Sequence, residues 1–239
     1  MKKYILSLFL PLFCTLFLPA ESMQQAEQMY REGRFAAALG AYENLLKNYP
    51  NDPHLYYNIG NCYFKMGSRG LATANYYRAF RLAPRDADIR HNLALVLESG
   101  GERLVPAGMP VVLHKAFFSL TVLELKGLTF LVLFVFCFLA GVWLCRRKAG
   151  LWACVSLAVL LLLGSWYAWR NSLLKQPLAI VAAPTAELRS GPGKNFPASA
   201  NVAQGHLLIL QDSKDNWDEV VVKSQGIKGW IETHDLEKI

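Results

Sequence analysis

Two long apolar segments dominate the hydrophobic pattern of this 239-residue chain, and three consecutive cations separate them. Residues 127–145 and 149–169 are almost entirely apolar. A helix of roughly 20 such residues is about 30 Å long, enough to cross the hydrocarbon core of a bilayer. Arg146, Arg147 and Lys148 would each cost roughly 2.5–3.5 kcal/mol at the centre of one continuous span. The pattern therefore predicts two transmembrane helices over these segments, with the three cations in the connecting turn.

The short turn also predicts how the rest of the chain is arranged about the membrane. A turn of three residues, 146–148, holds no domain, so the regions before and after the hairpin must emerge on the same face. Lys and Arg collect in the loops that stay in the cytoplasm. We therefore expect both flanking regions to lie outside the cytoplasm. The spans contain no ionisable residue, so they are interpreted as anchors and not as a transport pathway.

Before the hairpin, residues 23–100 repeat with a period of 34. Small residues, glycines, tyrosines and prolines recur in register, as the pairs Ala26 and Gly60, Gly33 and Gly67, Ala38 and Ala72, Tyr42 and Tyr76, and Pro50 and Pro84. This spacing resembles the tetratricopeptide helix-turn-helix repeat. Two full repeats are followed from Asp88 by a third unit that stops at Ser99-Gly100-Gly101 and is interpreted as a capping helix. An array this short is near the lower limit for independent stability, so we expect a partner or a second copy to complete its surface.

The tetratricopeptide resemblance implies a concave groove, lined by the first helix of each repeat, that binds an extended peptide segment. Projected onto this chain, the partner-binding positions are Glu27, Tyr30, Arg31, Tyr57, Asn58, Asn61, Lys65, His91 and Asn92. Amides and Tyr57 can hydrogen-bond a peptide backbone, and Lys65 can meet a carboxylate. The basic clamp that some family members use for a C-terminal carboxylate is incomplete, because Glu27 stands where an amide is needed. The alternative for each polar residue is an ordinary solvated surface.

After the hairpin, residues 177–239 alternate short apolar runs with Gly, Pro, Asp and Asn turns, which predicts a small antiparallel barrel. The run Leu188-Arg189-Ser190-Gly191-Pro192-Gly193, Trp217, and Gly229-Trp230-Ile231 resembles the bacterial SH3-type domain. Trp217 and Trp230 form either an aromatic face for a peptide or wall material, or part of the core. The fold class is thus a multi-domain membrane protein, with an all-α tetratricopeptide solenoid, a two-helix transmembrane hairpin and an SH3-like barrel.

The N-terminal residues 1–22 have the order of a secretory signal: Lys2-Lys3, an apolar run, then small residues at Ala20 and Ser22. An uncleaved anchor is the alternative, and both would export the helical repeats. Residues 101–126 are predicted to be a linker followed by a segment that lies on the membrane surface.

Charge and motifs exclude several classes of function. The net charge of +7 comes mainly from residues that flank the spans, since residues 23–98 carry +2 and residues 177–239 carry −2. No basic stripe for nucleic acid is formed. The exported parts contain no Gly-x-Ser-x-Gly, His-Glu-x-x-His, Cys-x-x-Cys or phosphate loop, so no enzyme, cofactor or metal is expected. His54 and His91 lack the company of other ligands, and Cys62 is interpreted as a small buried residue.

Signal segment, tetratricopeptide array, two spans and SH3-type domain, in this order, resemble the BatE-type proteins of the Bacteroides aerotolerance operon. The resemblance implies a two-pass protein of the bacterial inner membrane, with both domains in the periplasm. It also implies other Bat-type membrane proteins as partners, and a role in aerotolerance or envelope stress.

Two functions remain open from the sequence. The first is a protein scaffold that gathers partners through the groove and the SH3-type domain. The second is an anchor that binds or senses peptidoglycan through the SH3-type domain. Neither requires catalysis.

Overall fold

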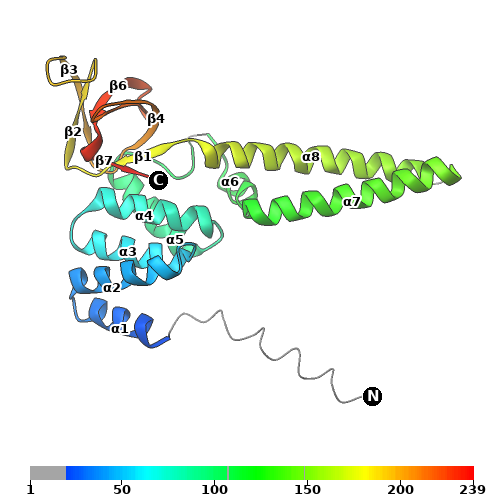
Figure 1. Ribbon diagram of the computed structural model, residues 1–239, viewed down its shortest axis with the longest axis horizontal. Helices are drawn as coiled ribbons and strands as arrows, with labels where there is room; N and C mark the ends of the chain where they lie inside the picture. The colour runs from blue at the N-terminus through cyan, green and yellow to red at the C-terminus, as the bar shows by residue number, and fades with distance from the viewer. Residues whose placement is uncertain (1–19, 107, 148) are drawn as a thin grey trace.

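The computed structural model describes residues 20–106, 108–147 and 149–239, and it consists of three parts (Figure 1). Helices α1 to α5 form a stacked array, helices α7 and α8 form a long hairpin, and strands β1 to β7 form a separate sheet. The predicted signal segment lies outside the described residues, apart from the start of α1. The array and the sheet both lie at the open end of the hairpin, and the turn between α7 and α8 lies at the other end.

The predicted helical repeat region is confirmed. Its helices are α1 (Ala20–Arg31), α2 (Phe35–Asn48), α3 (Pro53–Lys65), α4 (Arg69–Leu82) and α5 (Ala87–Ser99). The turns inside the two repeats contain Gly33 and Gly67, whose φ angles of 78° and 81° lie in the left-handed region that favours glycine. Asp52 and Asp86 cap α3 and α5 by accepting hydrogen bonds from backbone N–H groups in the first turn.

The register of the repeats is visible in the core of the array. Ala26, Ala38 and Ala72 have no exposed surface, and Tyr42 and Tyr76 are 2% and 1% exposed. A Cβ atom on Gly60 would lie 2.7 Å from the Tyr76 ring, so the glycine is what lets α3 and α4 approach at this point. Small residues on the first helix of a repeat thus receive an aromatic ring from the second.

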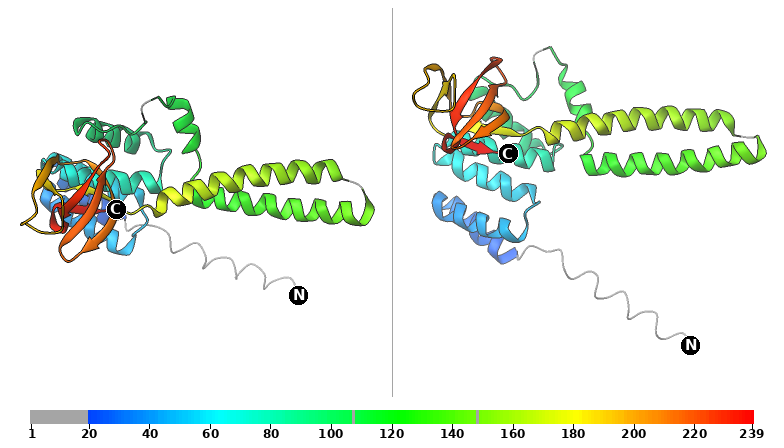
Figure 2. Two further views of the ribbon diagram at one scale, coloured as in Figure 1. Left: turned by 90° about the horizontal axis from the view of Figure 1, so that it is seen from above. Right: turned by 45° about the horizontal axis from the view of Figure 1, so that its top comes forward.

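The hairpin consists of α7 (Val122–Arg146) and α8 (Gly150–Lys175), so each helix extends past its apolar segment. Both are long and apolar enough to cross a membrane, and their apolar stretches are 0% and 6% buried within the chain. Thr121 and Glu124 form a capping box at the start of α7. Arg147 and Ala149 turn the chain at the far end with left-handed backbone angles. A short helix, α6 (Val111–Phe117), precedes the hairpin (Figure 2).

Arg170 fixes the base of the hairpin, a role that its sequence position beside the span does not reveal. Its side chain is 4% exposed and donates hydrogen bonds to the carbonyl oxygens of Phe117 (2.6 Å) and Leu120 (3.1 Å). The guanidinium also lies 4.4 Å from the centroid of the Phe118 ring. These contacts join the C-terminal part of α8 to the end of α6 and to the segment that follows it.

The C-terminal part is an antiparallel sheet, as predicted, but the predicted barrel is not closed. The strands are β1 (Leu178–Val181), β2 (Thr185–Arg189), β3 (Ala198–Ala203), β4 (Leu207–Lys214), β5 (Trp217–Val222), β6 (Ile227–Glu232) and β7 (Leu236–Lys238), with a 3-10 turn, η2 (Thr233–Asp235), before the last. Their order is β3-β2-β6-β5-β4-β1-β7, and every pair is antiparallel. Strands β3 and β7 are the two ends of this order, and no pairing joins them. The SH3-type assignment stays a prediction.

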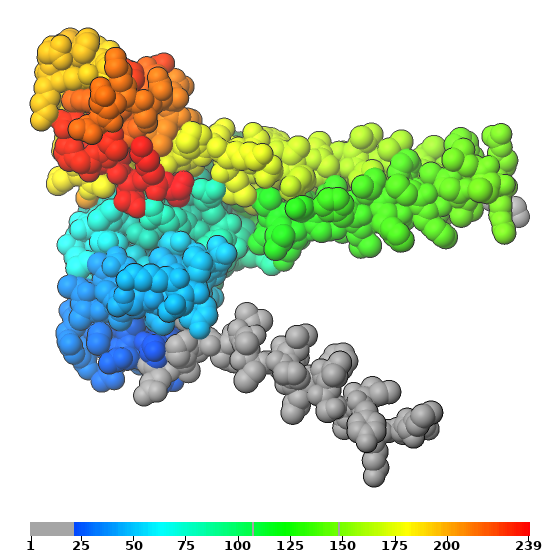
Figure 3. All heavy atoms as spheres, viewed as in Figure 1, coloured from blue at the N-terminus to red at the C-terminus, as the bar shows by residue number. Residues whose placement is uncertain are grey.

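The sheet packs directly against α4, which the sequence did not predict (Figure 3). Ala74 of α4 is buried in one apolar cluster with Leu178, Ile180 and Leu207 of the sheet. Arg78 pairs with Glu237 at 2.5 Å and donates to the carbonyl oxygen of Lys238 at 2.6 Å. The array and the sheet are therefore in direct contact and are not held together only by the connecting chain.

Candidate partner-binding site

The predicted groove residues lie on the first helices of the repeats, as the projection required. They are Glu27, Tyr30 and Arg31 on α1, Tyr57, Asn58, Asn61 and Lys65 on α3, and His91 and Asn92 on α5. Arg31 and Lys65 are exposed, and the tyrosines and asparagines are half-buried. Helices α1, α3 and α5 follow one another as the first helices of successive repeats in the array (Figure 1).

Asn61 and Asn92 form a polar network inside this surface. The Nδ2 of Asn92 donates to the Oδ1 of Asn61 and to the Tyr57 hydroxyl, both at 3.1 Å. The Tyr76 hydroxyl donates to the same Asn61 oxygen at 2.7 Å. This network links α3 to both α4 and α5. The amide of Asn61 thus holds the array together, and a substitution there would change folding as well as binding.

Asn58 and Lys65 are the better probes of partner binding. Within the described residues, neither side chain has a hydrogen-bond or ion-pair partner. Both lie on α3, the central first helix of the array. An amide can both donate to and accept from a peptide backbone, and an exposed ammonium can pair with a carboxylate. These two side chains can therefore contribute to a partner without loss of internal contacts.

The remaining groove positions are three residues of α1, which contact one another or their neighbours, and His91 of α5. Glu27 and Arg31 form an exposed ion pair at 3.4 Å, and Tyr30 packs edge-on against Phe35 at 5.3 Å between centroids. His91 is exposed and lines a hollow on another side of α5. An exposed ion pair of this kind contributes little to stability, so Glu27 and Arg31 remain free to rearrange around a ligand.

Cys62 and the histidines offer no reactive group in this region. Cys62 is fully buried in the cluster of α1, α2 and α3, and burial raises the pKa of its thiol to about 11. It is therefore a thiol and not a nucleophilic thiolate near neutral pH. His54 is exposed on α3. Across the described residues, no group of three His, Cys, Asp or Glu is arranged to hold a metal ion.

The two tryptophans of the sheet have different environments. Trp217 begins β5 and is 8% exposed, whereas Trp230, on β6, is only partly buried. Trp230 lies opposite Glu219 of β5 and Arg189 of β2 in the sheet register. Trp217 thus belongs to the packed interior, and Trp230 alone presents part of its ring at the surface.

The topology residues lie at the end of the hairpin farthest from both domains. Arg146 ends α7, Arg147 forms its C-cap, and both are exposed. Lys148 lies outside the described residues. The arrangement separates the basic turn from the array and the sheet by the full length of the hairpin (Figure 1).

The sequence did not predict the face of α4 that contacts the sheet and the end of α8. A Cβ atom on Gly70 would lie 2.3 Å from the carbonyl oxygen of Val181, so only glycine fits this approach. Arg81 donates to the carbonyl oxygen of Leu174 at the end of α8, at 2.8 Å. Small residues four apart, Gly70 and Ala74, on an outward helix face are the signal that could have indicated a second element there.

Comparisons with known proteins support the repeat assignment and extend no further. No family model matches the chain. Two curated relatives, tetratricopeptide repeat protein 16 of Macaca fascicularis and that of Homo sapiens, are each 29% identical to this chain over 76 residues, which is 32% of its length. The chain spans only 9% of the length of these relatives.

Among solved structures, the chain is similar to the type III secretion translocator chaperone SycD of Yersinia enterocolitica. The alternative dimer of SycD matches 35% of this chain at 20% identity and a TM-score of 0.33. SycD in complex with a peptide of the translocator YopD matches 65% of this chain at 13% identity and a TM-score of 0.34. Together with the 34-residue register, the curated relatives identify the helical part of this chain as similar to tetratricopeptide repeats.

Proposed function

We propose that this protein is a membrane-anchored scaffold that binds an extended segment of a partner protein along α1, α3 and α5. The observation that carries the proposal is the surface of α3, where Asn58 and Lys65 have polar groups with no hydrogen-bond or ion-pair partner in the described part of the chain. Tetratricopeptide-type arrays bind peptides in this way. The apolar hairpin supports a two-pass anchor in the lipid bilayer of the inner membrane, with the array and the sheet in the periplasm.

The contact between array and sheet sharpens this proposal. Arg78 and the cluster around Ala74 hold the sheet against α4, whereas the predicted groove positions lie on α1, α3 and α5. Two docked modules present their surfaces in one relative orientation, so a partner that fits both loses less entropy on binding. Other Bat-type membrane proteins are the partners we propose, in a complex that serves aerotolerance or the response to envelope stress.

The scaffold is favoured over a wall-binding anchor because it also uses the helical array, whereas wall binding depends on the sheet domain alone. An aromatic face for peptidoglycan would need both rings at the surface, but Trp217 is 8% exposed. The partly exposed Trp230 is then the one tryptophan of the sheet domain that is open to a ligand. It fits the second contact of a protein scaffold equally well.

Replacement of Asn58 and Lys65 by alanine tests the groove. Each loses about 1 kcal/mol of hydrogen bonding to a bound partner, so the double variant loses about 2 kcal/mol and we expect it to bind partners about thirtyfold more weakly. Partners are crosslinked in intact membranes, co-purified with the tagged full chain and quantified by mass spectrometry.

The matched control replaces Asn44 and Lys47 of α2 by alanine. Both side chains are exposed, and the Lys47 Nζ donates a hydrogen bond to the Asn44 Oδ1 at 2.9 Å. This control should recover every partner at the wild-type level. Equal recovery by the Asn58 and Lys65 variant would show that partners do not bind along α3.

A further inference from the structure

A third repeat begins in this chain and is then interrupted. In the first turn, the N–H groups of Gly33 and Arg34 donate to the carbonyl oxygens of Tyr30 and Met29. The same two bonds recur 34 residues later, and again a further 34 residues on, where Gly101 and Glu102 donate to Glu98 and Leu97. Gly101 also has a positive φ of 77°. The first helix and the turn of the third repeat are therefore complete, and its second helix should begin at residue 103.

Prolines prevent that second helix from forming. In the 34-residue register, the buried Ala38 and Ala72 correspond to Pro106, and the buried Tyr42 and Tyr76 correspond to Pro110. A proline inside a helix removes a hydrogen bond and clashes with the preceding turn. The chain accordingly has no helix from residue 101 to Pro110, within the described residues of this segment. It crosses α5 as a linker and forms α6 afterwards.

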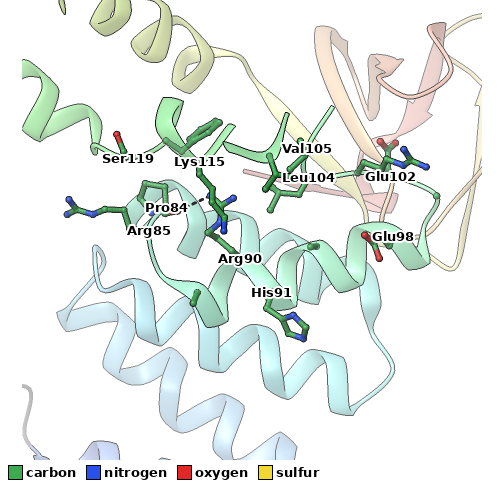
Figure 4. Close-up of a pocket in the computed structure, with 16 residues that line it drawn as sticks. Pro84, Arg85, Arg90, His91, Glu98, Glu102, Leu104, Val105, Lys115 and Ser119 are labelled. Carbon is green, nitrogen blue, oxygen red and sulfur yellow. Dashed lines mark hydrogen bonds between the residues drawn. The ribbon is translucent and has the colours of Figure 1, made fainter. Parts of the chain in front are cut away.

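A hollow of about 970 Å³ remains between α5, this linker and α6, and we name it the α5 hollow (Figure 4). Ala87, Arg90, His91, Ala94 and Glu98 of α5 form one wall, and Val105, Val111 and Lys115 lie on the other. Ala94 occupies the register position of Ala26 and Gly60. At that position in the second repeat, Gly60 receives the Tyr76 ring. The α5 hollow is thus at the place where a third ring would pack.

The charges around the α5 hollow complement the dipole of a helix that runs antiparallel to α5. Arg85, Arg90 and Lys115 lie toward one end, and Glu98 and Glu102 toward the other (Figure 4). Arg103, which also lines the α5 hollow, is exposed. A second helix would run antiparallel to α5, with its N-terminus at the carboxylates and its C-terminus at the cations. The helix dipole is positive at the N-terminus and negative at the C-terminus, so both ends would be stabilised.

Glu102 supplies a carboxylate at the end of the α5 hollow where the N-terminus of such a helix would lie. Its side chain is 9% exposed and lines the α5 hollow, and its Oε1 atom is buried with no hydrogen-bond partner among the residues that the structure describes. A buried carboxylate oxygen without a donor costs free energy, and this cost is removed when a donor arrives. The free N–H groups at the start of a helix are such donors.

We propose that the α5 hollow binds one helix of a partner protein, which completes the third repeat in trans. The helix runs antiparallel to α5, places a tyrosine or other aromatic side chain against Ala94, and directs its N-terminal N–H groups at Glu102. It carries a small residue four positions before the aromatic residue, as α2 and α4 do at Ala38 and Ala72. This surface is separate from the one formed by Asn58 and Lys65.

The test uses a synthetic helix with this pattern and the full chain in detergent. The probe is a peptide of residues 35–48 of this chain, labelled at its C-terminus. A lactam between the side chains of Glu43 and Lys47 stabilises it, because a free helix of this length is marginal in water. We expect saturable binding by fluorescence anisotropy, and at least about tenfold weaker binding when Tyr42 of the peptide is replaced by alanine.

Substitutions in the full chain locate the binding. Ala94→Trp fills the α5 hollow and should weaken binding at least about tenfold, whereas Ala37→Trp, at an exposed alanine of α2, should leave it unchanged. Glu98→Lys is a second variant at an exposed position, so it preserves the fold. It should weaken binding about two- to fivefold, because it places a cation at the N-terminus of the helix.

Three results would overturn the proposal. They are an absence of saturable peptide binding, equal binding to wild type and Ala94→Trp, and a dimer of the chain that Ala94→Trp dissociates. The last result would assign the α5 hollow to a second copy of this chain.

Discussion

The variant Tyr76→Ala is expected to lose about 3–5 kcal/mol of stability in the helical array. The Tyr76 ring is 1% exposed, and its Cδ1 and Cε1 atoms would contact any Cβ atom at Gly60. Its hydroxyl donates to Asn61 at 2.7 Å, so truncation leaves both a cavity and a polar network without one of its donors. Because the array has only two complete repeats, a loss of this size should expose α3 and α4 together.

Hydrogen–deuterium exchange of the full chain measures this effect. Peptides of α3 and α4 should exchange much faster in Tyr76→Ala, while the core strands of the sheet stay protected. Tyr76→Phe is the matched control, since it keeps the ring and should cost only about 0.5–1.5 kcal/mol for the lost hydrogen bond. If Tyr76→Ala and Tyr76→Phe exchanged alike, the ring would not be the element that joins α3 to α4.

The variant Gly70→Ala is expected to separate the sheet from the array. The added Cβ atom would lie 2.3 Å from the carbonyl oxygen of Val181 and 2.9 Å from the Cα atom of Ala182. Both are backbone atoms and cannot rotate away, so the cost is about 1–3 kcal/mol and falls on the contact between α4 and β1. Pulsed electron paramagnetic resonance between spin labels at positions 47 and 223 should change from a narrow to a broad distance distribution.

Gly40→Ala is the control for this experiment. Gly40 lies in α2, and a Cβ atom there meets nothing within 4 Å. The same substitution should therefore leave the distance distribution narrow, and it should stabilise the helix by about 0.5–1 kcal/mol. A narrow distribution in Gly70→Ala would mean that the close approach at Val181 does not hold the two domains together.

The parts of the fold that depend on periodicity could be predicted from the sequence. The 34-residue register placed Gly33 and Gly67 in turns and Tyr42 and Tyr76 in the core, because a small residue and an aromatic ring must meet in each repeat. Residues 127–145 and 149–169 were found as helices because their length and lack of charge allow little else.

The parts that depend on contacts between distant segments could not be predicted in this way. Strand β7 pairs with β1 and not with β3, so the sheet stays open, and no local pattern in three residues specifies that partner. Trp217 could be core or surface until its neighbours were known. The bonds of Asn61 to Tyr76 and Asn92 join residues 15 and 31 positions away, so its structural role was hidden among ordinary polar residues.

The 34-residue register continues past the two complete repeats into the start of a third. Gly101 continues the series that begins at Gly33, although the sequence was interpreted only as ending in a capping helix. Pro106 and Pro110 at the next two register positions explain why the series stops. The sequence contained both facts, but the hollow beside α5 follows only from the path that the linker takes.

Cysteine labelling in intact spheroplasts tests the central claim most directly, namely that both domains lie outside the cytoplasm on a two-pass anchor. Single cysteines are introduced as Lys65→Cys in the array, Lys223→Cys in the sheet and Arg147→Cys in the turn, at exposed positions of a chain whose own cysteines have been replaced. We predict that a membrane-impermeant maleimide labels positions 65 and 223 at once, and position 147 only after the membrane is permeabilised. Two results would contradict this topology. In the first, positions 65 and 223 are protected in intact spheroplasts while position 147 is labelled. In the second, only one of positions 65 and 223 is labelled.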